Sequence, residues 1–236
     1  MAHSGEIRLL ALLGLRLKGF ASADAVAEVV GQDPGLIAAE LDDCVADGLA
    51  VFNPQRQVYL LNPAQGRSEG ERLLASQLDR LGVRQRVENA YGRFLELNPE
   101  ILQLCTDWQI CQQPDGERTL NDHSDPDYDA QVIDRLGQLD ARLRDVLAEL
   151  GSAIDRYSVY GPRFGTALRL LDEGNLEYFT KPIIPSYHTV WFELHEHLLA
   201  VLGRDREHEA TPDAIPTNAA GSGRPGRRAP GTGDTP

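Results

Sequence analysis

Residues 41–66 read LDDCVADGLAVFNPQRQVYLLNPAQG, and this stretch decides the fold of the N-terminal part of the chain. It begins inside a helical pattern that ends at Gly48. Two short runs with strand-forming residues follow, at residues 49–52 and 57–61, and the turn formers Asn-Pro-Gln-Arg separate them. The stretch therefore predicts a helix that leads directly into a two-stranded hairpin.

Upstream of this stretch, the pattern predicts two further helices. Apolar residues recur at helical spacing over residues 6–18, and Gly19 stands where a helix would end. Ser22 is placed to cap a second helix, and the Asp-Pro pair at 33–34 is placed to start a third. Three helices followed by a hairpin predict a winged helix-turn-helix over residues 1–64.

The rest of the chain predicts an all-α domain over residues 65–203, so the expected fold class is mainly α. Within it, the pattern predicts one or two helices over 66–97 and further helix starts at Asn98-Pro99 and Asp125-Pro126, with a loop over 112–124. It also predicts a helix over 157–171 that Gly161-Pro162 breaks early, and a last helix capped by Ser186. From residue 204 onward Pro and Gly repeat and large apolar residues almost disappear. Such a segment buries too little surface to offset its ordering entropy, so residues 204–236 are predicted to be a disordered tail.

Composition narrows the class of protein. No run approaches the roughly 20 apolar residues that a membrane span needs, and Met1 to Glu6 lack the basic start of a secretion signal. The three scattered cysteines (Cys44, Cys105 and Cys111) favour a reducing compartment over a disulfide framework. We therefore expect a cytoplasmic protein that binds no membrane, with no metal site and no cofactor.

Charge weighs against DNA binding by the predicted third helix. The net charge is -13, and residues 1–64 hold four basic and eight acidic side chains. The segment 33–47 carries only acidic charges, at Asp33, Glu40, Asp42, Asp43 and Asp47. A recognition helix normally presents basic or polar side chains to phosphates and bases. A dimer could still bind DNA through the four cations of this part, which are Arg8, Arg16, Lys18 and Arg56. The alternative is that the winged helix serves as a docking or dimerisation module.

The predicted last helix supplies the first candidate ligand-binding residues. At 100° per residue, one face carries His188, Trp191, Phe192, His195, Leu199 and Leu202, while Glu193, Glu196 and His197 fall off it. Histidine and tryptophan combine apolar area with a polar group, as small-molecule sites require. His188, Trp191 and His195 are thus predicted to line a pocket. The alternative is that both histidines are core residues bonded to neighbours.

Further candidate ligand-binding residues lie elsewhere in the predicted helical domain. The polar loop before the Asp-Pro helix start contains Asp122 and His123, for which no capping role is evident. Asp107 stands beside large apolar side chains, although it could equally face solvent. Tyr160 and Arg163 flank the Gly-Pro pair and could hold an acidic ligand, or could pack around a kink.

Several motifs together resemble a known family. They are LRLKGFAS at 15–22, FLELNPEILQLCTDWQ at 94–109, NDHSDPDYDAQVIDRL at 121–136, YGPRF at 160–164 and SYHTVWFELHEHLLAVLG at 186–203. With the turn at Leu61-Asn62-Pro63, they make residues 6–204 similar to an actinobacterial family of MarR-like winged-helix proteins with a helical C-terminal domain. The resemblance implies the fold and a regulatory label but no catalytic residues. This chain departs from the family at the wing, which is richer in arginine in its relatives.

Two classes of function remain after this reading. One is a ligand-responsive winged-helix transcriptional regulator that binds a small molecule in its helical domain. The other is a biosynthetic enzyme or accessory protein that uses the same pocket and whose winged helix no longer binds DNA. The sequence leaves open whether the chain is an enzyme, since no familiar nucleophile, phosphate-loop or dinucleotide motif is present. The expected partners are a small molecule, weakly bound DNA and a second copy of the chain.

Overall fold

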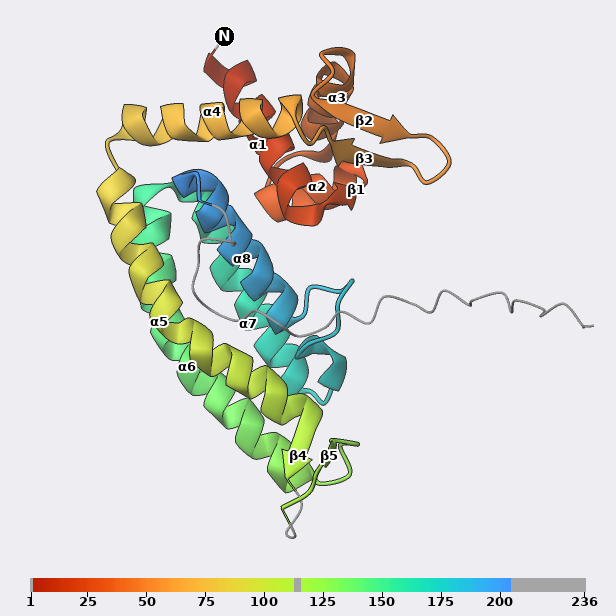
Figure 1. Cartoon of the computed structure of the whole chain (residues 1–236), viewed down its shortest axis with the longest axis vertical. Helices are drawn as coiled ribbons and strands as arrows, with labels where there is room; N and C mark the ends of the chain where they lie inside the picture. The colour runs from red at the N-terminus through yellow and green to blue at the C-terminus, as the bar shows by residue number, and fades with distance from the viewer. Residues whose placement is uncertain (1, 113–115, 205–236) are drawn as a thin grey trace, which may run out of the picture.

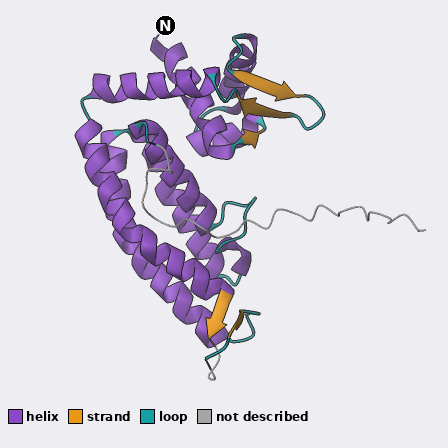
Figure 2. Ribbon diagram, viewed as in Figure 1, coloured by secondary structure: helices purple, strands orange, loops and turns teal. Residues whose placement is uncertain are grey.

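The computed structural model of the protein describes residues 2–112 and 116–204 (Figure 1). The described chain is mainly helical, as the sequence predicts, with small antiparallel sheets (Figure 2). Within those ranges, every helix is too short or too polar to cross a membrane. The predicted tail lies outside the described residues except for Arg204.

The N-terminal part contains three helices and a three-stranded antiparallel sheet of strand order β1-β3-β2. Its elements are α1 (Ala2–Lys18), β1 (Phe20–Ala21), α2 (Ala23–Val30), α3 (Pro34–Ala46), β2 (Ala50–Asn53) and β3 (Val58–Leu61). The predicted caps are confirmed, because Ser22 Oγ accepts from Ala25 N–H and Asp33 Oδ1 accepts from Leu36 N–H. The predicted hairpin is β2-β3, and the two-residue β1 is an addition that sequence periodicity could not reveal.

The remaining elements form a bundle of long helices. They are α4 (Gln65–Leu81), α5 (Arg84–Gln109), β4 (Ile110–Gln112), β5 (Arg118–Leu120), α6 (Pro126–Ala153), the 3-10 helix η1 (Asp155–Val159), α7 (Tyr160–Asp172), the 3-10 helix η2 (Leu176–Tyr178) and α8 (Tyr187–Leu202). Figure 1 shows α5 and α6 as a long antiparallel pair, with α7 and α8 beside them and the β4-β5 hairpin at the end far from α1.

Two predictions about helix boundaries and one about a loop are wrong. Residue Pro99 lies inside a continuous α5, and Asn98 accepts a hydrogen bond from Trp191 Nε1 instead of capping a new helix. Packing of α5 against α6 and α8 outweighs the backbone bond that proline removes. Pro162 lies in the first turn of α7, where no N–H is needed, so it does not break the helix. The predicted loop at 112–124 contains β5 and the end of β4.

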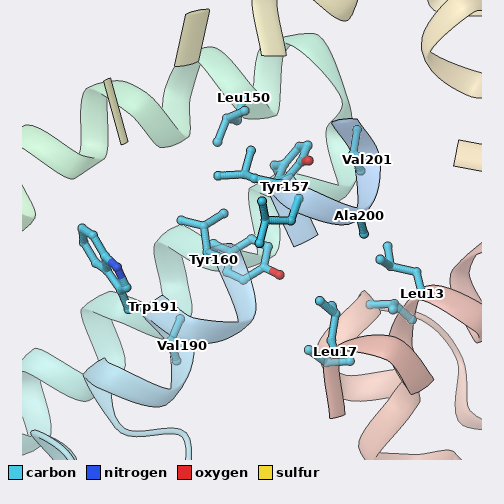
Figure 3. Close-up of a cluster of buried hydrophobic side chains, with 14 of the residues drawn as sticks. Leu13, Leu17, Leu150, Tyr157, Tyr160, Val190, Trp191, Ala200 and Val201 are labelled. Atoms are coloured by element: carbon cyan, nitrogen blue, oxygen red, sulfur yellow. The ribbon is translucent and has the colours of Figure 1, made fainter. Parts of the chain in front are cut away.

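Helices α1 and α8 join the two parts of the molecule. The apolar side chains of α1 are buried on nearly all sides, because α1 packs against α2 and α3 and also against α4 and α8. Figure 3 shows Leu13 and Leu17 of α1 facing the region of α8 that carries Ala200 and Val201. The buried apolar residues of both parts therefore form one continuous core.

Candidate functional site

The structure places Trp191 and His195 in an aromatic core between α8 and α5. Trp191 stacks on Phe94 with ring centroids 4.6 Å apart, and its Nε1 donates to Asn98 Oδ1 at 3.0 Å. His195 is buried, and its ring lies 5.3 Å from that of Phe94. His188, one turn before Trp191, is half-buried. The cleft described below is lined by other residues.

The predicted apolar face of α8 is partly wrong. Phe192, assigned to that face, is 45% exposed, whereas Glu193 and His197, assigned off it, are only 2% and 3% exposed. The reason is that α8 packs against α1, α4, α5 and α7, so it is surrounded on most sides and not covered along a single stripe.

The polar loop before α6 forms a separate cluster at the far end of the bundle. His123 Nδ1 lies 3.0 Å from Asp129 Oδ2, and the buried Asp129 carboxylate also accepts from Asn121 Nδ2 at 2.9 Å. Asp122 has a local role that the sequence reading missed, because its Oδ1 accepts from Ser124 N–H. The His123 side chain thus has a fixed orientation, while Asp122 stabilises the loop.

A stack of rings connects this loop to the start of α8. His123 lies 4.6 Å from the ring of Trp108, and Trp108 stacks on Phe179 at 4.5 Å. The Phe179 carbonyl accepts from His188 N–H at 3.0 Å. Asp107, by contrast, accepts from Gln103 and from Arg135 of α6. The row of rings from His123 therefore ends at Phe179, whose backbone bonds to that of His188, and Asp107 belongs to the α5-α6 contact.

Tyr160 and Arg163 lie near α1, in a buried polar network that differs from the aromatic core. Arg163 Nη2 donates to Glu193 Oε2, and Lys18 Nζ of α1 donates to Glu193 Oε1 at 2.8 Å. The Tyr160 hydroxyl lies 3.1 Å from His197 Nδ1 and 3.3 Å from the Glu193 carbonyl oxygen. The network thus ties α1 and α7 to two polar residues of α8.

His197 connects this network to Arg156 of η1. Arg156 Nε donates to His197 Nε2 at 2.9 Å, so Nε2 is an acceptor and the neutral ring carries its proton on Nδ1. That proton can be donated to the Tyr160 hydroxyl, which in turn donates to the Glu193 carbonyl. Burial, together with the charge of Arg156, lowers the pKa of His197 well below its usual range. His197 is therefore neutral at neutral pH.

Arg156 is a partly buried cation with incomplete partners. Its Nη1 donates to Gln77 Oε1 of α4, and burial lowers the pKa of its guanidinium. Its Nη2 is buried and has no hydrogen-bond acceptor among the described residues. In residues 2–112 and 116–204, no carboxylate forms an ion pair with Arg156. The charge of Glu6 favours the charged form of Arg156 without forming an ion pair with it, so the position beside Arg156 is suited to a ligand with a negative group.

Arg156 lines a cleft of about 580 Å³ between the N-terminal helices and the bundle. The residues that line the cleft come from α1, α4 and η1 and from the ends of α2 and α6. They are Glu6, Leu10, Val30, Gly31, Gln32, Gln77, Arg80, Leu81, Ala153, Ile154, Asp155, Arg156, Ser158 and Val159. The two parts approach closely at one edge, since a Cβ added at Gly31 would lie 2.7 Å from Val159 Cγ1. The volume is in the range of small-molecule sites.

Sequence reasoning missed Arg156, His197 and Glu193. One signal was available: α8 is apolar on most sides, so polar residues at positions 193 and 197 of such a helix are expected to be buried and bonded. No local pattern marks Arg156, because its partners are far away in the sequence.

Three of the four cations proposed to contact DNA have carboxylate partners in the structure. Arg8 pairs with Glu40 and Asp47 of the α3 region, and its Nε lies 2.7 Å from Glu40 Oε1. Arg16 pairs with carboxylates of α4 and α8, and Lys18 pairs with Glu193. Arg56 is exposed in the turn between β2 and β3.

Comparisons of the chain with models of protein families, with curated proteins and with solved structures gave no match. The resemblance to the MarR-like family therefore stays a prediction from the sequence motifs.

Proposed function

We propose that the protein is a ligand-responsive regulatory protein in which residues 1–64 form a winged helix-turn-helix and the cleft binds a small molecule. The observation that carries this proposal is the origin of the lining, which combines α1 and α2 with α4 and η1. A ligand that contacts both parts can favour one arrangement of them over another, which is the physical requirement for a ligand response.

The order of the N-terminal elements supports the winged-helix assignment. Three helices precede a hairpin that is extended to three strands by β1. The helix in the recognition position is α3, whose exposed charged residues are acidic. The proposed regulatory output therefore does not depend on α3 entering the major groove.

Affinity for duplex DNA is expected to be weak at physiological salt, no tighter than about micromolar. The physical reason is that α3 presents acids and that Arg8, Arg16 and Lys18 already have carboxylate partners. A gel-shift assay with genomic fragments measures this directly. Nanomolar, sequence-specific binding would overturn the prediction, and Arg56→Ala would then show whether the hairpin turn provides the contact.

The proposed ligand response is tested by hydrogen exchange on the full-length protein. A compound identified by a thermal-shift screen is expected to slow exchange at α1, at the end of α2 and at η1, since these segments line the cleft. Protection confined to the far end of the bundle, near β4 and β5, would place the ligand elsewhere and contradict this function.

The His123–Asp129 pair favours a second candidate function, an enzyme that uses proton transfer. If Nδ1 of a neutral His123 ring donates to the carboxylate, Nε2 is left as an acceptor, and His123 has a strained backbone with φ of 60°. Incubating the protein with metabolite mixtures and following turnover by NMR tests this candidate. Turnover that His123→Ala abolishes and Asp122→Ala preserves would support an enzyme, whereas turnover unaffected by His123→Ala would exclude this pair.

A further inference from the structure

Arg156 differs from the other partly buried arginines of the molecule. Arg8, Arg16 and Arg163 each pair with at least one carboxylate. Arg156 instead contacts a neutral amide, a neutral imidazole and the ring of Tyr157, whose centroid lies 5.7 Å from its guanidinium carbon, and no carboxylate of the described residues pairs with it. Charges that are largely removed from water are normally paired, so an anion in the cleft would complete the contacts of Arg156.

The cleft also carries charges of both signs. Arg80 follows Gln77 by three residues on α4, which places both on the same face of the helix beside Arg156. Glu6 and Asp155 also line the cleft, and the remaining wall includes apolar side chains of α1, α2 and η1. Two cations and two anions beside an apolar wall disfavour a polyanion such as a nucleotide, because the two carboxylates would repel it.

From these charges we infer that the cleft binds a small zwitterion of the amino-acid class, with a carboxylate, an ammonium group and an apolar side chain. The inference rests on the proposed function and specifies its ligand. The ligand carboxylate binds the guanidinium groups of Arg156 and Arg80 and supplies the missing negative charge. The ammonium group binds Glu6 or Asp155. The side-chain amide of Gln77 accepts a hydrogen bond from Arg156, so Gln77 lies beside the position proposed for the ligand carboxylate.

The test uses the full-length protein and the standard amino acids, each at millimolar concentration, in a thermal-shift assay followed by calorimetry. At least one amino acid with an apolar side chain is expected to bind. Its decarboxylated amine and its deaminated acid are expected to bind at least about tenfold more weakly, because each loses one charge-assisted contact. Absence of binding by every amino acid, or equal binding of the decarboxylated amine, would overturn the inference.

Two variants locate the contact. Gln77→Glu places a carboxylate beside Arg156, so it is expected to raise the melting temperature and to weaken amino-acid binding at least about tenfold. Arg80→Gln, at an exposed position, is expected to weaken binding while leaving the melting temperature unchanged. The control is Arg72→Gln on the same helix, which alters an exposed pair with Glu69 and is expected to leave binding unchanged.

The same measurements separate this inference from the proposed function. If a compound without a carboxylate binds and protects α1, α2 and η1 from exchange, the proposed function stands and the zwitterion assignment fails. If an amino acid binds at wild-type affinity to both Gln77→Glu and Arg80→Gln, the carboxylate does not lie beside Arg156, and the inference also fails. If it binds as inferred but protects none of the N-terminal segments, only the regulatory function fails.

Discussion

Glu193→Ala is expected to lower the free energy of unfolding by about 3–5 kcal/mol, the range found when one partner of a buried ion pair is removed. The Glu193 side chain is 3% exposed and neutralises both Lys18 of α1 and Arg163 of α7. Its removal leaves two partly buried cations without this partner. For a chain of this size, the melting temperature should fall by on the order of 10 °C. Urea unfolding and calorimetry measure both quantities.

The matched control is Glu173→Ala, which removes an exposed pair with Arg169 one turn away on α7. That change is expected to cost at most about 0.5 kcal/mol, as is usual for exposed pairs. Glu193→Gln keeps the size of the side chain and removes only its charge. If Glu193→Gln and Glu173→Ala have equally small effects, the buried network does not stabilise the contact between α1 and α8.

The features predicted best from the sequence are those that depend on neighbouring residues. Ser22, Asp33 and Ser186 cap helices because a side-chain oxygen accepts from a backbone N–H three residues ahead. The β2-β3 hairpin was predictable for the same reason, because the residues that form its turn are neighbours in the sequence. Asn98 shows where local reasoning fails, since it has the signature of a cap but bonds to Trp191, which lies 93 residues away.

The candidate site was harder to predict because its contacts are long-range. His123 was singled out because no capping role is evident for it, but its partner Asp129 lies inside α6 and no local pattern links the two side chains. Arg16 and Lys18 could be counted as cations in the sequence, but their pairing with α8 depends on how α1 packs in the fold. Charge counts therefore indicate a surface only when the partners of each charge are known.

Stability is expected to fall as the pH drops below about 6.5, because His197 must stay neutral in the folded protein. Its pKa in the unfolded chain is about 6.5, and burial lowers its pKa in the folded chain. The unfolded chain therefore takes up a proton that the folded chain does not. The stabilisation that His197 contributes is fully present above its pKa in the unfolded chain. It falls by up to about 1.4 kcal/mol per pH unit as the pH drops towards its pKa in the folded chain. Urea unfolding at several pH values measures this slope.

His197→Gln isolates the contribution of this one group from those of the other histidines and the carboxylates. Glutamine does not titrate, and its side-chain oxygen can still accept from Arg156 Nε, so the variant is expected to have a shallower slope below about pH 6.5. The cost of protonating His197 arises from its contact with Arg156. An imidazolium ring cannot accept from the guanidinium, and protonation would place a second positive charge beside Arg156, whose Nε lies 2.9 Å from His197 Nε2. Equal slopes for the wild type and His197→Gln would mean that His197 takes up its proton without unfolding, and that the contact with Arg156 does not hold it neutral.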